Sequence, residues 1–89
     1  MTGTTKSGFS FSVDEVAAAA DNMELLDALA EMESDNDPLA VSRVCRLLLG
    51  RDTRKALYDH LRTEDGRVPV AQVVAELLEI MGSTSAGKN

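Results

Sequence analysis

The feature of this sequence that most restricts its fold is the spacing of apolar residues over positions 70–81. They stand at i, i+3, i+4, i+7, i+8 and i+11: Val70, Val73, Val74, Leu77, Leu78 and Met81. This repeat places them on one face of an α-helix, with Gln72, Glu76 and Glu79 on the opposite face. Only 3% of the residues are aromatic, so the core must be built from aliphatic side chains, which pack helix against helix. The sequence therefore predicts a helical fold.

Capping residues mark the helix starts in the first half of the chain. Ser12, followed three residues later by Glu15, is a capping-box pattern that begins a helix over residues 13–20. Asp21 can cap the apolar run that follows. Whether residues 13–33 form one helix or two is left open by this pattern.

Proline and glycine mark the boundaries in the second half. Asp37 as a cap and Pro38 in the first turn begin a helix that ends at Gly50. Asp52 caps the next helix, and Pro69 begins the last one. We therefore expect an all-α fold, a compact bundle of four to five short helices with flexible termini.

The chain is expected to form one domain. Residues 1–8 and 82–89 are rich in Gly, Ser and Thr and carry little apolar surface, which predicts flexible N-terminal and C-terminal tails around a helical domain at residues 9–81. Phe9 and Phe11 stand at the entry to that domain. They either pack as a lid over the core or form an exposed aromatic anchor for a partner.

Helical spacing also selects the core. The residues expected to be buried are Leu26, Leu29, Val44, Leu48, Leu57, Leu61, Val73, Leu77 and Leu78. Cys45 belongs with them as a small buried hydrophobe. Residues 39–49 are apolar around much of the helix, which predicts a central helix and favours self-association of so short a chain.

Charge and composition exclude several functions. The net charge of −6 opposes binding to nucleic acid, and no stretch reaches the roughly 20 apolar residues of a membrane helix. No signal peptide is recognised at the N-terminus, which favours a cytosolic protein. The charge is uneven: residues 1–37 carry nine acidic side chains and one lysine, whereas residues 38–89 carry six acidic and eight basic ones. The two halves can attract one another or select partners of opposite charge.

No motif predicts catalysis or a bound cofactor. Cys45 and His60 are the only residues of their types, so one chain cannot form a Cys/His zinc cluster or a disulfide. Asp59 and His60 are neighbours in a helix and point about 100° apart, and no nucleophile accompanies them. The loop around Gly66 lacks the carboxylates of a calcium loop and is interpreted as a turn between two helices. We expect no enzyme activity, no cofactor and no metal.

Four short segments carry a family resemblance. They follow one another in this order: LLLG at residues 47–50, LYDHLR at 57–62, EDGRVPV at 64–70 and AELLEI at 75–80. With these segments, residues 37–81 resemble the tail assembly chaperones of long-tailed (siphovirus-type) bacteriophages. The resemblance implies a helical protein that is made in the host cell cytoplasm and is absent from the mature virion.

Such a chaperone binds the tape measure protein and helps recruit tail tube subunits, in many cases through a longer form made by ribosomal frameshifting. Codons for Gly87, Lys88 and Asn89 can form a slippery run, which predicts a frameshift site there. We expect partner binding through apolar and aromatic side chains, with these candidates: Phe9, Phe11, Leu39, Leu47, Leu49 and Tyr58.

The alternative function is a small helical regulatory or DNA-binding module. It would use the basic residues of the second half, namely Arg43, Arg46, Arg51, Arg54, Lys55 and Arg62. Gly50 followed by the capping Asp52 leaves no clear recognition helix, and the negative net charge opposes this interpretation. The chaperone interpretation is therefore preferred.

Overall fold

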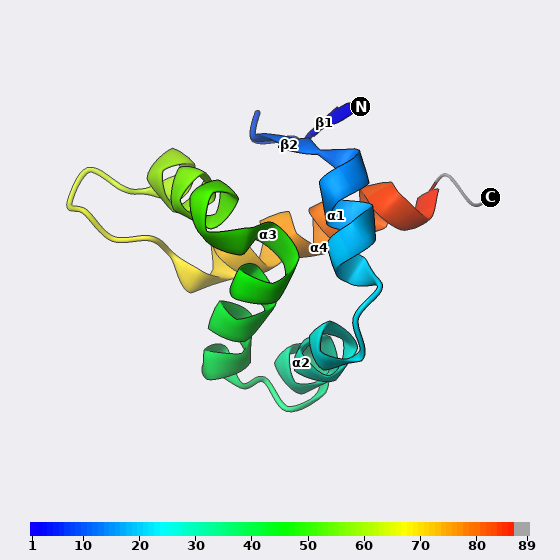
Figure 1. The fold of residues 1–89 in the computed structure, drawn as a ribbon. Coiled ribbons are helices and arrows are strands. Elements are labelled where there is room, and N and C mark those ends of the chain that lie inside the picture. Colours follow the sequence, from blue (N-terminus) through cyan, green and yellow to red (C-terminus); the bar gives the residue numbers. More distant parts are fainter. Residues whose placement is uncertain (87–89) are drawn as a thin grey trace.

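The computed structural model describes residues 1–86, with side chains described to Ser83, and most of them are helical (Figure 1). Two short strands precede four helices: β1 (Thr2–Thr4), β2 (Ser10–Ser12), α1 (Val13–Ala20), α2 (Met23–Ser34), α3 (Pro38–Leu61) and α4 (Val70–Ala86). Helix α3 is central, because α1, α2 and α4 all pack against it, and α4 also packs against α1. The predicted helical class is confirmed, with a small two-stranded sheet added.

The helix starts use side-chain caps, with one correction. The Ser12 hydroxyl accepts a hydrogen bond from the Glu15 amide at 3.2 Å, and the Asp37 carboxylate accepts one from the Leu39 amide at 3.0 Å, as predicted. Residues 13–33 divide into two helices, and Asn22 rather than Asp21 caps the second. The backbone of Asn22 is extended, which lets its side chain reach the Glu24 amide at 2.9 Å.

Gly50 divides α3 into two helical segments. Its backbone angles are φ 75° and ψ −176°, a conformation that residues with a Cβ rarely adopt. The chain changes direction there, and the second segment then continues to Leu61. The predicted helix end at Gly50 is therefore confirmed as a break inside α3.

The N-terminal segment, predicted as a flexible tail, is instead one arm of a β-hairpin. Strands β1 and β2 pair antiparallel, with Thr2 opposite Ser12 and Gly3 opposite Phe11. The side chains of Phe9 and Phe11 are buried, so the second arm supplies the apolar surface that the first arm lacks. The composition of residues 1–8 alone could not reveal this pairing, because strand pairing joins residues of two segments.

Contacts with both α3 and α4 attach the hairpin to the helices. The Lys6 amide donates a hydrogen bond to Glu79 Oε1 of α4 at 2.7 Å. The His60 ring on α3 lies within hydrogen-bond distance of the Ser7 hydroxyl, at 3.0 Å, and its centroid is 5.7 Å from that of Phe9. The hairpin therefore joins the end of α3 to the second half of α4.

The core is aliphatic, as predicted, but α4 presents a different face to it. The completely buried side chains of the core include Leu25, Ala28, Val44, Cys45, Leu57, Leu77 and Ile80. Leu26 and Leu78, predicted to be buried, are 46% and 42% exposed, and Leu29 and Leu61 are only partly buried. Helix α4 is rotated so that Val73, Glu76, Leu77 and Ile80 face inward. Its apolar stripe is wider than one contact face, so one edge of the stripe remains outside.

Residues 82–86, predicted as part of a polar tail, continue α4 to Ala86. The proposed frameshift site at Gly87, Lys88 and Asn89 lies outside the described residues. Among the helices described, none has the length and apolar character needed to span a membrane.

Candidate functional site

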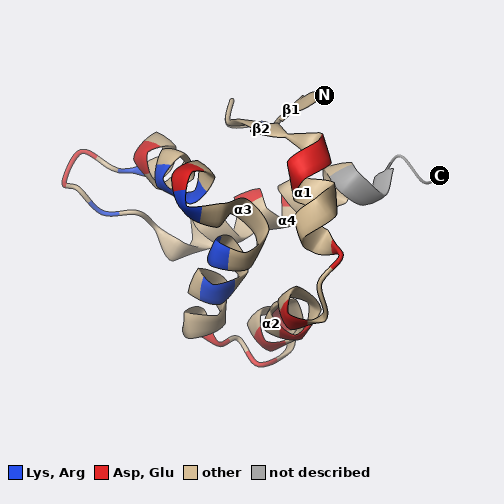
Figure 2. Cartoon of the chain, viewed as in Figure 1, with Lys and Arg blue, Asp and Glu red and all other residues tan. Residues whose placement is uncertain are grey.

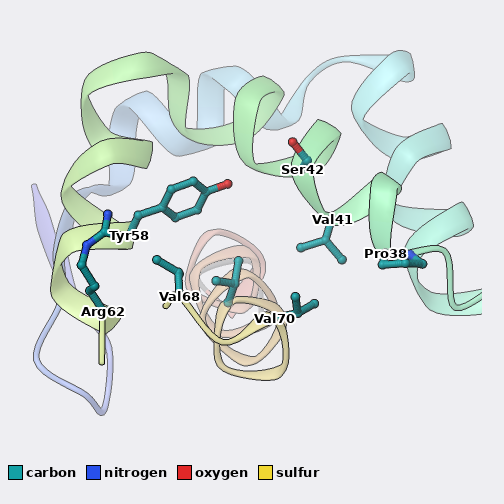
Figure 3. A pocket seen from close by; sticks show the side chains of 8 residues that line it. Pro38, Val41, Ser42, Tyr58, Arg62, Val68 and Val70 are labelled. Atoms are coloured by element: carbon teal, nitrogen blue, oxygen red, sulfur yellow. The ribbon is translucent and has the colours of Figure 1, made fainter. Parts of the chain in front are cut away.

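An apolar groove opens between α3 and α4. Its larger cleft, of about 330 Å³, is lined by Pro38, Val41, Ser42, Tyr58, Arg62, Val68, Val70 and Val73 (Figure 3). A smaller cleft of about 170 Å³ adjoins it and is lined by Met32, Asn36, Asp37, Pro38, Val41, Val70 and Val74. The two clefts share Pro38, Val41 and Val70. We call this continuous surface the apolar groove.

The break at Gly50 and the loop after α3 produce this groove. The first segment of α3 supplies Val41, and the second, after the change of direction, supplies Tyr58. The loop closes on itself: the Thr63 amide donates to the Arg67 carbonyl at 2.8 Å, and Gly66 adopts φ 90°. It returns the chain so that Val68 and Val70 complete the lining. This confirms the prediction of a turn that sets two helices against each other.

The outer edge of α4 makes part of the groove accessible. Val70 is 54% exposed, and Val74 is partly buried one turn further along. Covering an exposed valine with a partner is favourable by about 25 cal/mol per Å² of apolar surface removed from water. The groove is therefore suited to binding an apolar side chain of a partner.

A cationic cluster lies beside the apolar groove. Arg51, Arg54, Lys55, Tyr58, Asp59 and Arg62 line a cleft of about 320 Å³. Tyr58 and Arg62 also line the groove, so the two surfaces are continuous. Hydrogen bonds from Lys55 and Arg62, both 3.2 Å, lower the pKa of the Asp59 carboxyl. This one carboxylate lies among four cationic side chains, so the cluster is strongly positive.

Tyr58 covers Cys45. The thiol is completely buried, as predicted, and burial raises its pKa, although a hydrogen bond with Tyr58 and the charge of Arg54 act in the opposite direction. Burial and the neighbouring Cys45 likewise raise the pKa of the Tyr58 hydroxyl. Both groups are therefore uncharged at neutral pH, and Tyr58 presents a neutral, amphipathic wall to the groove (Figure 3).

The structure brings few of the predicted partner-binding residues together. Tyr58 lines the groove, and Leu39, 75% exposed, directly follows its lining residue Pro38. Leu49 is partly buried, and Leu47 lines a separate cleft between α2 and α3.

Phe9 and Phe11 are buried in the core, so the exposed-anchor hypothesis is wrong for both. Both belong to the hairpin and pack from it into the core, which agrees instead with their alternative interpretation as a lid.

Sequence reasoning missed most of the groove. Val41, Val68 and Val70 line it, but the sequence pattern indicates only that they belong to helices or to the turn between them. The width of the apolar stripe on α4 was the available signal, because a stripe too wide for one contact leaves a second edge outside. Arg62 was identified only as a basic residue of the alternative function.

Charge is distributed unevenly over the helices, as Figure 2 shows, although α3 also carries Asp52 and Asp59. Acidic side chains gather on α1 and α2, and basic ones on α3. One described ion pair links α2 to α3, between Glu31 and Arg43 at 2.6 Å. Both side chains are more than 40% exposed, so this pair contributes at most about 1 kcal/mol to stability. The uneven charge is therefore mostly free to act on partners.

Asp59 and His60 do not act together. Asp59 accepts hydrogen bonds from Lys55 and Arg62, whereas the His60 ring contacts Ser7 of the hairpin.

Comparisons with protein families, with curated proteins and with solved structures find no match to this chain. The apolar groove and its surroundings are therefore the features that indicate the function.

Proposed function

We propose that this protein is a tail assembly chaperone of a long-tailed bacteriophage. It binds the tape measure protein and helps recruit tail tube subunits while the tail is built. The observation that carries the proposal is the solvent-open apolar groove between α3 and α4. Such a surface can bind and cover the apolar face of a helix without catalysing a reaction.

Two of the four segments that carry the family resemblance line the groove, and the other two lie on the helices that form it. LLLG ends at the Gly50 break, LYDHLR supplies Tyr58 and Arg62, and EDGRVPV supplies Val68 and Val70. AELLEI contains Leu77 and Ile80, which anchor α4 to the core. This correspondence supports the proposal, because residues within the resembling segments also line the groove.

Binding of this kind has to be reversible, since the tape measure protein must be released as the tube polymerises around it. A groove of modest volume with a polar rim suits reversible binding, because only a few apolar side chains are buried at a time. On this proposal the protein acts in the host cell cytoplasm and is absent from the mature virion. Recruitment of tail tube subunits would use a longer, frameshifted form.

Co-expression tests the proposal. An otherwise insoluble tape measure fragment should stay in solution with the wild-type protein and aggregate with Val70→Asp, which places a charge in the groove. The matched control is Met23→Asp, on the exposed side of α2, which should protect the fragment as well as wild type does. Equal aggregation with and without the protein would contradict the chaperone function.

A DNA-binding module is the second candidate, favoured by the cationic cluster. A binding titration against duplex DNA distinguishes the two functions. A phosphate-binding protein loses affinity steeply as the salt concentration rises, whereas the chaperone proposal expects no such complex at physiological salt.

A further inference from the structure

The cationic cluster holds four cationic side chains but one carboxylate, Asp59, in the lining of its cleft. Lys55 and Arg62 share Asp59, and within the described part of the chain Arg51 and Arg54 form no ion pair. The acidic helix α2 pairs with Arg43 on the other segment of α3. Among the residues that line the cleft, four cations surround one carboxylate, so the cluster keeps a net positive charge.

We propose that the apolar groove and the cationic cluster together select an amphipathic helix of another protein that carries carboxylates along one edge of its apolar stripe. The inference rests on the proposed function and adds the charge of the partner. Tyr58 and Arg62 line both surfaces, so a helix seated in the groove extends directly past the cluster. Its apolar side chains cover the exposed Val70, and its carboxylates face Arg51 and Arg54.

The local charge opposes the charge of the whole chain. At a net charge of −6, the molecule as a whole repels an acidic helix and attracts a basic one. At physiological ionic strength, however, charges more than about 8 Å apart are largely screened, so the groups beside the groove decide. The net charge of the chain therefore predicts a preference for a basic helix, whereas the charges beside the groove predict a preference for an acidic one. This difference makes the selection testable.

Two synthetic peptides of roughly 18 residues, long enough to be helical, provide the probe. They share one leucine stripe and lack Tyr and Trp, and they carry either Glu or Lys along its edge. Tyr58 is the only tyrosine in a chain without tryptophan, so its fluorescence reports occupancy of the groove. Since each exposed ion pair contributes a factor of about two to five, the Glu peptide should bind about tenfold more tightly than the Lys peptide.

A charge-reversed variant tests the assignment to the cluster. Arg51→Glu with Arg54→Glu should invert the preference, because both side chains reach solvent and can be replaced without opening the core. Lys6→Glu with Arg67→Glu changes the net charge by the same amount outside the cluster, and should leave the preference as in wild type. Circular dichroism checks that both variants are folded.

Three results would overturn the inference. Equal affinity for both peptides would show a groove without charge selection and would leave the proposed function standing. Binding of neither peptide would count against the groove and hence against the proposed function itself. A Tyr58 signal that changes with protein concentration alone, together with dimers in sedimentation, would show that a second copy occupies the groove.

Discussion

Glu76 lies on the buried side of α4, with 6% of its surface exposed. Its Oε1 atom is sealed from solvent and has no hydrogen-bond partner among the described residues. A buried polar atom without a partner is destabilising by about 1–3 kcal/mol, because it has lost its bonds to water. The neighbouring Val73, Leu77 and Ile80 are apolar, so an apolar side chain fits this position better.

Replacing Glu76 should therefore stabilise the protein. We expect Glu76→Leu to raise the free energy of unfolding by about 1 kcal/mol in urea titrations followed by circular dichroism. Glu79→Leu is the matched control one turn away. It removes the acceptor of the Lys6 amide and should lower the free energy of unfolding. A destabilising Glu76→Leu would show that the Glu76 carboxylate is hydrogen-bonded in the folded protein, against this expectation.

At the scale of the elements, two glycines differ in the space that surrounds them, one in strand β1 and one in helix α4. A Cβ on Gly3 would lie 2.7 Å from the Phe11 ring and 3.1 Å from a Val13 methyl, so only glycine fits beside the buried ring. A Cβ on Gly82, within α4, would meet no atom of the described residues within 4 Å, apart from its chain neighbours and the backbone of its own helix. The same substitution should thus have opposite effects at these two positions.

Gly3→Ala should lower the free energy of unfolding by about 1–3 kcal/mol, since the hairpin must shift to admit the methyl group. Gly82→Ala should raise it by up to about 1 kcal/mol, through the higher helix propensity of alanine. Thermal unfolding of the two variants beside wild type measures both effects. A tolerated Gly3→Ala would mean that the hairpin does not pack as closely as described.

The elements also show what a single sequence can predict. Caps and breaks are local, so Ser12, Asp37 and Gly50 were assigned from their neighbours alone. Strand pairing of residues 2–4 with 10–12 is not local, and no pattern within either segment required it. The rotation of α4 was ambiguous for a different reason: both edges of its stripe are apolar, and packing against α1 and α3 chose between them.

The groove was hidden for the same reason. Val41 comes from the first segment of α3, whereas Val68 and Val70 come from the loop and the start of α4. Their proximity depends on the direction of the chain after Gly50, which sequence spacing does not contain. Tyr58 was the exception, because an aromatic residue on a helix of an aromatic-poor chain is conspicuous on its own.

For the whole molecule, exposed apolar side chains predict self-association. Leu39 is 75% exposed, and Met23 and Leu26 are exposed on α2. Large apolar side chains left in water favour contact between copies. We expect sedimentation to report dimers or larger species at micromolar concentrations, and Leu39→Glu to shift the population towards monomer. A monomer at every concentration would exclude self-association without affecting the chaperone proposal.

Helix α4 also fixes a distance. It extends 17 residues from Val70, in the groove, to Ala86, which at about 1.5 Å per residue makes a rod of about 25 Å. The hairpin is attached to this helix at Glu79, nine residues beyond Val70 and so about 14 Å along α4 from the start of the groove. An affinity tag joined to the N-terminus would begin from the hairpin rather than from a groove-lining residue, so we expect it to leave the groove accessible. Under the chaperone proposal, the length of α4 would separate the bound tape measure helix from a tail tube subunit recruited through the longer, frameshifted form.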